Sequence, residues 1–133
     1  MACNLRLITA AATALLAACA KDETAPAQTL EDQGMIEFRS CAVCHARTAP
    51  DDPETIRLSG PSLFGVAGAP AARLADYDYS PALRRAGFVW DDAKLDAYIA
   101  RPQAVVPGTR MGYGGEPDAE KRAAIIAYLK TLK

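Results

Sequence analysis

The reactive side chains of this sequence gather in one short motif, Cys41-Ala42-Val43-Cys44-His45. The spacing C-x-x-C-H is the one at which two cysteine thiols bond covalently to a haem. On a helix, residues three apart lie on the same side, so both thiols can reach the two vinyl groups on one edge of the ring. The imidazole of His45 follows directly and can act as the proximal ligand of the iron. The motif therefore predicts one covalently bound haem c.

Three structures without haem explain the motif less completely. A disulfide between Cys41 and Cys44 leaves the position of His45 unexplained. A thioredoxin-like redox pair requires a βαβ context, and the sequence shows no pattern of that kind. A structural zinc site needs four ligands, and after residue 18 the only further cysteine is Cys19.

The second axial ligand of such an iron must come from the opposite face of the ring. His45 is the only histidine of the chain, so a pair of histidine ligands is excluded. Met35 precedes His45 on the same expected helix and therefore lies on the wrong side of the ring. Met111 lies in the glycine-rich segment PGTRMGY, which can fold closely over a haem. We therefore expect His45 and Met111 to be the metal ligands.

The elements that must position these residues are helices and long loops. Apolar residues at helical intervals, together with the helix caps Ser80 and Asp91, predict four helices. They cover approximately 31–45, 81–85, 92–101 and 117–132. Residues 46–79 and 102–116 are rich in proline and glycine and are expected to be loops. The predicted fold class is all-α, and so much loop is easier to understand if something other than side chains fills the centre.

Length and composition limit the possible classes of protein. The chain has 133 residues, of which 50% are hydrophobic, so one domain with a buried core is expected. The formal net charge is −1. This balance argues against a nucleic-acid partner, because nucleic-acid binding proteins carry an excess of basic residues.

The first twenty residues are typical of a targeting segment. The uncharged run Leu7–Ala20 follows Arg6 and has 14 residues. As a helix it would span about 21 Å, which is short of the roughly 30 Å hydrocarbon core of a membrane. A secretory signal peptide is therefore expected rather than a membrane span. The segment ends in the letters LAAC at Cys19, which resembles a bacterial lipoprotein signal with cleavage before the cysteine and a lipid on its thiol; the alternative is cleavage after Ala20.

The expected organisation has three parts. Residues 1–18 form the lipoprotein-type signal peptide, residues 19–30 an acylated Cys19 with a flexible tether, and residues 31–133 the folded domain. The lipid would hold the protein on a bacterial membrane, facing the periplasm. The alternative cleavage site would give a soluble periplasmic protein.

From about Gly34 to Leu132 the chain resembles the class I c-type cytochromes, which are small electron carriers with one haem. The resemblance rests on Gly34, Phe38, Cys41, Cys44, His45, Gly60-Pro61-x-Leu63-x-Gly65, Tyr79-Ser80, Trp90, Leu95-x-x-Tyr98, Pro102, Pro107-Gly108-Thr109-x-Met111 and Ala127-Tyr128-Leu129. It implies the cytochrome c fold, with three main helices plus short helices and loops around one covalent haem. It also implies that Gly34 lets the first and last helices cross closely, with Phe38 packed against Leu129 or Tyr128.

The resemblance further implies roles for residues around the haem. The carbonyl of Pro61 would accept the Nδ1 proton of His45 and so orient the imidazole. Tyr79 and Trp90 would donate hydrogen bonds to a haem propionate; an ordinary place in the apolar core is the alternative for both.

Two further positions concern the tuning of the iron. Tyr98 would lie near the sulfur of Met111. Many relatives carry an arginine after the glycine that corresponds to Gly68, where it helps to neutralise a propionate, but this chain has Ala69. Arg73 is a candidate to replace it.

An iron with two protein ligands has no open position for a substrate, so we expect an electron-transfer protein and not an enzyme. By resemblance it would link a quinol-oxidising complex or a dehydrogenase to a terminal oxidase or reductase of a respiratory chain, as a monomer. The alternative is a haem enzyme or a sensor of peroxide, NO or CO in which Met111 gives way to the ligand. Arg39, Arg47 and Arg110 either form a basic rim that steers an acidic partner or are scattered solvated charges.

Overall fold

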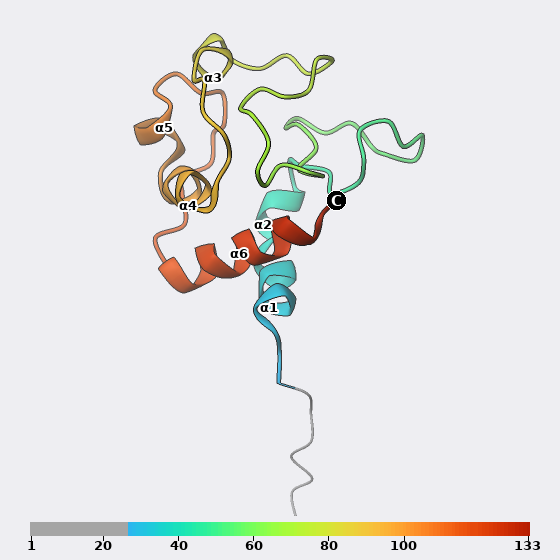
Figure 1. The fold of residues 1–133 in the computed structure, drawn as a ribbon, viewed down its shortest axis with the longest axis vertical. Coiled ribbons are helices and arrows are strands. Elements are labelled where there is room, and N and C mark those ends of the chain that lie inside the picture. The colour runs from blue at the N-terminus through green and yellow to red at the C-terminus, as the bar shows by residue number, and fades with distance from the viewer. Residues whose placement is uncertain (1–26) are drawn as a thin grey trace, which may run out of the picture.

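A computed structural model describes residues 27–133, and six helices lie in this part of the chain (Figure 1). They are α1 (Leu30–Glu37), α2 (Arg39–Ala42), α3 (Pro81–Arg84), α4 (Asp92–Ala100), α5 (Pro102–Val105) and α6 (Ala119–Thr131). Within these residues no strand is present, and one isolated antiparallel bridge joins Pro70 and Val89. The predicted all-α class is confirmed. The predicted signal peptide and Cys19 lie outside the described residues.

The first helix begins with a capping box at Thr29. The Thr29 hydroxyl accepts a hydrogen bond from the Asp32 amide at 3.1 Å, and the Asp32 carboxylate accepts one from the Thr29 amide at 3.1 Å. These bonds satisfy two amides that the start of a helix leaves without partners. The helix therefore begins at Leu30, one residue before the predicted start of the domain.

The crossing of α1 and α6 depends on a glycine, as predicted (Figure 1). A Cβ atom added to Gly34 would lie 1.9 Å from the carbonyl oxygen of Ala124. Beside this contact the rings of Phe38 and Tyr128 pack with their centroids 5.1 Å apart. Only a residue without a side chain allows the two backbones to approach so closely.

The predicted helix over 31–45 is wrong in its length. The structure divides it at Phe38 into α1 and the four-residue α2, which ends at Ala42. Beyond it, a turn in which the His45 amide donates to the Cys41 carbonyl at 2.9 Å carries the chain onward. His45 is therefore presented from a turn and not from a helix face.

The helix α4 lies where the sequence predicts it. The Asp91 carboxylate caps it by accepting from the Lys94 amide at 2.7 Å, and Leu95, Tyr98 and Ile99 are its buried residues. The prediction that 102–116 is entirely loop is wrong, because Pro102 begins α5. Proline lacks an amide hydrogen, so Pro102 cannot continue the hydrogen bonding of α4. The first turn of a helix needs no such hydrogen bond, so the same proline is well suited to begin α5.

The last helix, α6, begins at Ala119 rather than at Pro117. The Asp118 carboxylate accepts from the amides of Glu120 and Lys121 at 2.8 and 3.3 Å, which places the helix start after the aspartate. This helix forms part of the core with the buried residues Ala124, Ile125, Ile126, Tyr128 and Leu129. None of the helices in residues 27–133 is long and apolar enough to cross a membrane.

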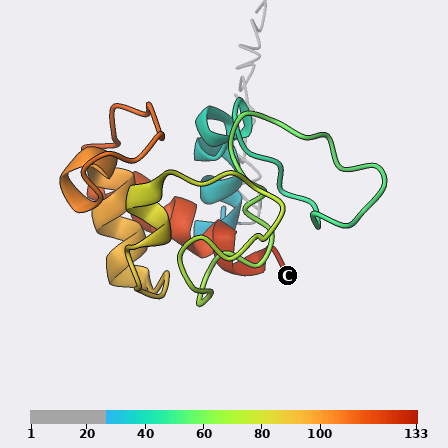
Figure 2. The same ribbon diagram turned by 90° about the horizontal axis from the view of Figure 1, so that it is seen from above.

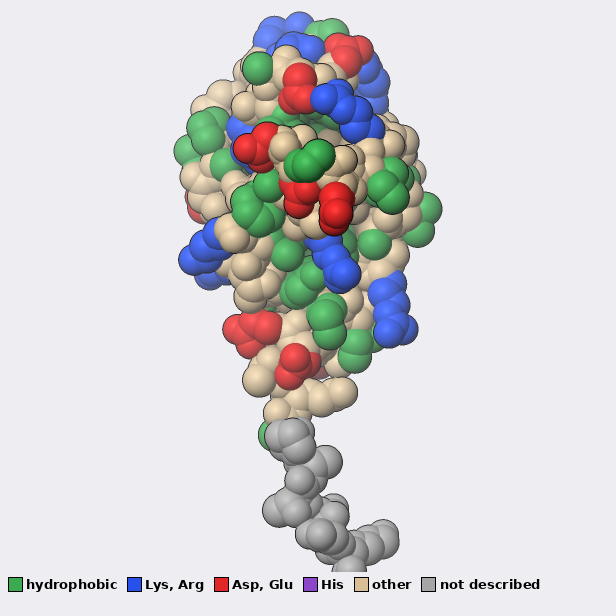
Figure 3. All heavy atoms as spheres, turned by 90° about the vertical axis from the view of Figure 1, so that its right-hand side faces the viewer, with side chains coloured by type: hydrophobic (Ala, Val, Ile, Leu, Met, Phe, Trp, Pro, Cys, Tyr) green, Lys and Arg blue, Asp and Glu red, His purple; other side chains and the backbone are tan. Residues whose placement is uncertain are grey.

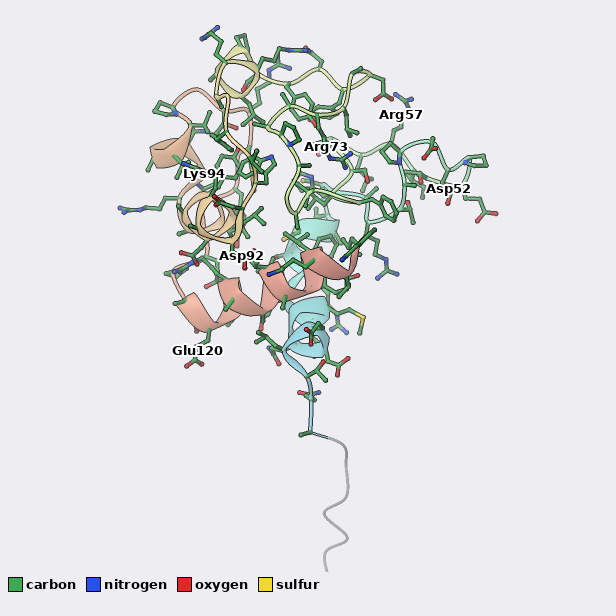
Figure 4. All side chains as sticks on the ribbon, viewed as in Figure 1. Asp52, Arg57, Arg73, Asp92, Lys94 and Glu120 are labelled. Atoms are coloured by element: carbon green, nitrogen blue, oxygen red, sulfur yellow. The ribbon has the colours of Figure 1, made fainter. Side chains whose placement is uncertain are left out.

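A long connection over 46–79 replaces regular structure on one side of the molecule, and Figure 2 shows part of it projecting away from the helices. Internal hydrogen bonds give it shape: the hydroxyls of Thr48 and Thr55 lie 2.7 Å apart, and Ser62 Oγ donates to the Thr48 carbonyl at 2.6 Å. Asp52 and Arg57 point outward from it, whereas Arg73 lies toward the centre of the fold (Figure 4). This segment supplies one wall of the cavity described below.

Candidate functional site

A cavity of about 540 Å³ lies at the centre of the fold and is lined by the residues of the C-x-x-C-H motif and by the Met111 loop. Its volume falls within the range of roughly 300–1,000 Å³ in which small-molecule and cofactor sites occur. Its lining is largely apolar and includes Leu63, Val66, Leu83, Leu95, Ile99 and Leu129. An apolar wall of this kind excludes water from whatever group the cavity holds.

The two cysteines of the motif lie at one edge of the cavity. They are not joined to each other in a disulfide. Cys41 is half-buried, and burial raises the pKa of its thiol, an effect that a hydrogen bond with Ser40 partly offsets. Cys44 is exposed. One edge of a planar group bonded to both sulfurs would therefore reach the surface.

His45 is oriented by the backbone of the opposing loop. Its Nδ1 lies 2.7 Å from the Pro61 carbonyl oxygen, and because a carbonyl can only accept, Nδ1 carries the proton and Nε2 keeps its lone pair. Burial lowers the pKa of His45, which favours this neutral form. Gly60 is also required, because a Cβ atom there would lie 2.5 Å from the His45 ring. The contact between Pro61 and His45 agrees with the one that the resemblance implies.

Met111 lines the cavity, whereas Met35 is 47% exposed on α1 and is not among the lining residues. The Met111 loop is held from one side by Gln103, whose Nε2 donates to the Thr109 carbonyl at 2.8 Å. The Met111 amide donates to the Thr109 hydroxyl at 3.3 Å. The sequence indicated no role for Gln103. Its partners are backbone carbonyls, which every residue has, so the types of the surrounding side chains do not predict these hydrogen bonds.

The residues present fit a covalently attached haem. Two thiols lie at one edge, a neutral imidazole with a free Nε2 contributes to one wall, and a thioether lines the same cavity. These are the donor types that c-type haem uses. Bound there, haem would supply an iron that accepts and releases one electron.

Known proteins resemble the chain over most of this domain. No family model matches it. Cytochrome c2 of Rhodopila globiformis is 47% identical over 93 residues, which cover 70% of this chain and 83% of that protein. A cytochrome c homolog of Rickettsia felis is 42% identical over 100 residues, so the chain covers 55% of its length. The structure of cytochrome cH from Methylobacterium extorquens matches with a TM-score of 0.68 at 41% identity, covering 76% of this chain and 97% of that one.

The chain belongs to the class I c-type cytochromes. Members of this family are haem-based electron carriers, and the cytochrome described here carries haem c bound covalently through Cys41 and Cys44. The helical arrangement around the cavity is the cytochrome c fold. These findings agree with the fold, family and cofactor expected from the sequence.

Two aromatic residues of the cytochrome, for which propionate binding and a place in the apolar core were the two expectations, border the cavity. Tyr79 and Trp90 are 6% and 7% exposed, and both are lining residues. The Trp90 ring packs against Phe88 and Tyr98 with centroids 4.7 and 4.8 Å apart. Burial raises the pKa of Tyr79, so its hydroxyl keeps its proton at neutral pH. Each is thus buried in the core and also borders the cavity.

Tyr98 lines the same cavity as Met111, near whose sulfur the resemblance places it. Its hydroxyl lies 2.6 Å from the hydroxyl of Thr109, in a buried contact. Thr109 also accepts the Met111 amide, so Tyr98 contacts the Met111 loop through threonine. The resemblance includes Thr109 in its motif, but only the structure shows that Thr109 connects Tyr98 with the Met111 amide.

Arg73 lines the same cavity from the long connection. Its Nη2 donates to the carbonyls of Ser62 and Phe64. Ala69, which stands where many relatives have arginine, exchanges only backbone hydrogen bonds with Val66 and Trp90. A guanidinium therefore borders the cavity, although it comes from a different position of the chain.

Proposed function

We propose that this cytochrome is a one-electron carrier whose iron is ligated by His45 and Met111. The observation that carries the proposal is that Met111 lines the same cavity as His45, whereas Met35 does not. An iron held by the His45 imidazole and the Met111 thioether would have no vacant position, and this pair would favour a higher reduction potential than stronger donors do. The protein is then a carrier and not an enzyme.

The surrounding residues hold these ligands in place. The Pro61 carbonyl fixes the orientation of His45, and Tyr98 with Thr109 supports the Met111 loop. Ligands that do not move when the iron changes charge keep the reorganisation small. The apolar lining keeps out water, which would otherwise reorient around the new charge.

Other lining residues would bind the haem propionates. Tyr79 and Trp90 each bring a hydrogen-bond donor to the cavity wall, and Arg73 brings a guanidinium. We propose that Arg73 takes the part that an arginine at the position of Ala69 plays in relatives. A guanidinium is always charged and can pair with a carboxylate through two hydrogen bonds.

Electron exchange would take place at the edge that carries the cysteines. Val43, between them, is 75% exposed, and Cys44 is exposed as well. The partners we propose are a quinol-oxidising complex or dehydrogenase as the donor and a terminal oxidase or reductase as the acceptor. The contacts of Arg110 with Asp78 and of Arg47 with Tyr128 favour scattered charges over a basic rim. On the face drawn in Figure 3, acidic and basic side chains are mixed.

Optical spectroscopy of the purified protein tests the ligand pair. We expect the oxidised protein to show a sulfur-to-iron charge-transfer band and the reduced protein to bind no carbon monoxide at neutral pH. The unfolded, reduced protein serves as the positive control, because it has lost the Met111 ligand and must bind the gas. Rapid binding by the native protein would support the sensor or enzyme alternative instead.

We further propose that residues 1–18 are removed as a lipoprotein signal, that Cys19 carries the lipid, and that residues 19–30 tether the domain, from residue 31 onward, to a periplasm-facing membrane. Intact mass and fractionation test this. We expect the wild-type protein in the membrane fraction, with a mass above that of residues 19–133 by the lipid and haem. Cys19→Ser should abolish the lipid mass, and Cys3→Ser, in the part that is removed, should leave it unchanged. A soluble chain that begins at an unmodified Lys21 would contradict the anchor.

A further inference from the structure

Arg110, the residue before Met111, is hydrogen-bonded to a segment that lies far away in the sequence. Arg110 Nη1 donates to the Asp78 carboxylate at 2.8 Å and to the Asp78 carbonyl at 2.9 Å. Its Nη2 lies 3.5 Å from the Tyr79 carbonyl oxygen. Asp78, Arg110 and Met111 all line the cavity. The position of the Met111 loop is therefore linked to the segment that contains Asp78.

A second arginine contacts the same carboxylate from α3. Arg84 Nη2 donates to Asp78 Oδ1 at 3.1 Å, while Arg110 occupies Oδ2. Arg84 Nε also donates to the Tyr79 carbonyl at 3.2 Å. The hydrogen bond from Arg110, followed by that from Arg84, holds the pKa of Asp78 below its usual range. The Asp78 carboxylate thus pairs with two guanidinium groups, those of Arg84 and Arg110, which also both contact the Tyr79 carbonyl oxygen.

The Met111 loop is consequently held from two sides. Gln103 bonds the Thr109 carbonyl on one side, and Asp78 bonds the Arg110 side chain on the other. Met111 lies two residues from the first contact and one residue from the second. Movement of Met111 out of the cavity requires the loop to loosen at one of these contacts.

We propose that Asp78 is a positioning residue for Met111: by pairing with Arg110 and Arg84 it keeps the loop closed and so limits how often the sulfur leaves the iron. This inference rests on the proposed ligation by Met111. It concerns the equilibrium between closed and open loop, not the identity of the ligand.

Removal of Asp78 acts in two ways on that equilibrium. The side chains of Asp78 and Arg110 are 79% and 56% exposed, and exposed pairs of this kind contribute little individually. Without the carboxylate, however, Arg84 and Arg110 face each other around the Tyr79 carbonyl, so an attraction is replaced by a repulsion. We expect the open population to rise about threefold to tenfold.

Imidazole binding to the oxidised, haem-loaded protein measures this population. Added imidazole can reach the iron only when Met111 has left, so its apparent affinity is proportional to the open fraction. Asp78→Asn should raise that affinity about threefold to tenfold. Asp76→Asn is the matched control, because Asp76 lies in the same segment and pairs with Arg57 at 3.1 Å but contacts no residue of the Met111 loop. It should leave the affinity within about twofold.

The salt dependence of imidazole binding separates positioning from a general loss of stability. In the wild type, salt screens an attraction and should raise the affinity for imidazole. In Asp78→Asn, salt screens the repulsion between Arg84 and Arg110 and should therefore lower the affinity for imidazole. Combining Asp78→Asn with Arg110→Gln gives a further comparison. Expressed as free energies, the change in imidazole affinity of the double variant should not exceed the sum of the changes in the two single variants, and it should be smaller than that sum if Asp78 and Arg110 act as one unit.

The outcomes are distinct for the two proposals. If the wild-type protein lacks the sulfur-to-iron band, ligation by Met111 fails, and with it the basis of this inference. If the band is present but Asp78→Asn binds imidazole no more tightly than Asp76→Asn, Asp78 has no positioning role and the ligation stands. An equal salt dependence of the wild type and Asp78→Asn would also overturn the positioning role.

Discussion

Replacing Met111 with histidine should lower the reduction potential of the cytochrome by an amount on the order of 0.2 V, because axial ligands tune haem potentials over a range of about 0.8 V. Imidazole donates more strongly to ferric iron than a thioether does, so the oxidised state is stabilised. Met111 lines the cavity, and a Cβ atom at the next residue, Gly112, would meet no atom within 4 Å, so the loop has room to adjust. Potentiometric titration of the purified variant measures the shift.

The charge-transfer band provides a second readout of the same substitution. Met111→His should abolish the sulfur-to-iron band while the haem remains bound through Cys41 and Cys44. Met35→Leu is the matched control, since Met35 is 47% exposed on α1 and does not line the cavity. It should leave both the potential and the band unchanged. If Met35→Leu removes the band and Met111→His does not, the assignment of the ligand is wrong.

Gly34→Ala should lower the free energy of unfolding by about 3 kcal/mol, at the upper end of what overpacking usually costs. The added methyl group would lie 1.9 Å from the Ala124 carbonyl oxygen and 2.7 Å from Tyr128 Cβ. The first of these neighbours is backbone, which no change of rotamer moves, so α1 and α6 must separate. Separation would expose Phe38 and Tyr128, whose rings pack beside the crossing. Denaturant titration of the haem-loaded protein measures the loss.

A second glycine controls for the general effect of adding a methyl group. A Cβ atom at Gly114 meets nothing within 4 Å, and this exposed residue does not have a positive φ. Gly114→Ala should therefore change the free energy of unfolding by no more than about 0.5 kcal/mol. Equal losses for Gly34→Ala and Gly114→Ala would show that the helix crossing does not depend on the glycine.

Local patterns predicted the elements whose causes are local. Ser80 and Asp91 were identified as caps because a side-chain oxygen and an amide three residues later are neighbours in sequence. The buried face of α4 follows from the spacing of its apolar residues. The single helix expected over 31–45 was wrong because periodicity records which residues face the core and does not record a break in the backbone at Phe38.

The sequence alone determined the chemistry of the site, because that chemistry resides in a covalent motif. Two cysteines three residues apart and the adjacent His45 specify haem c wherever the chain folds around them. The presence of only one histidine and the glycine-rich setting of Met111 led to the prediction that Met111 is the second ligand, which is the ligand proposed above. The family resemblance added Pro61, whose carbonyl lies 2.7 Å from His45 Nδ1 in the structure.

Only the tertiary structure decided how the Met111 loop is held. Thr109 is the partner of Tyr98, Gln103 bonds backbone carbonyls, and Asp78 pairs with Arg110 across 32 positions of the chain. Such contacts depend on where separate segments meet in space, and any exposed aspartate or arginine of the sequence is an equally good candidate beforehand. A ligand is specified by its own chemical type and its neighbours in sequence, whereas its support comes from distant residues that folding alone brings together.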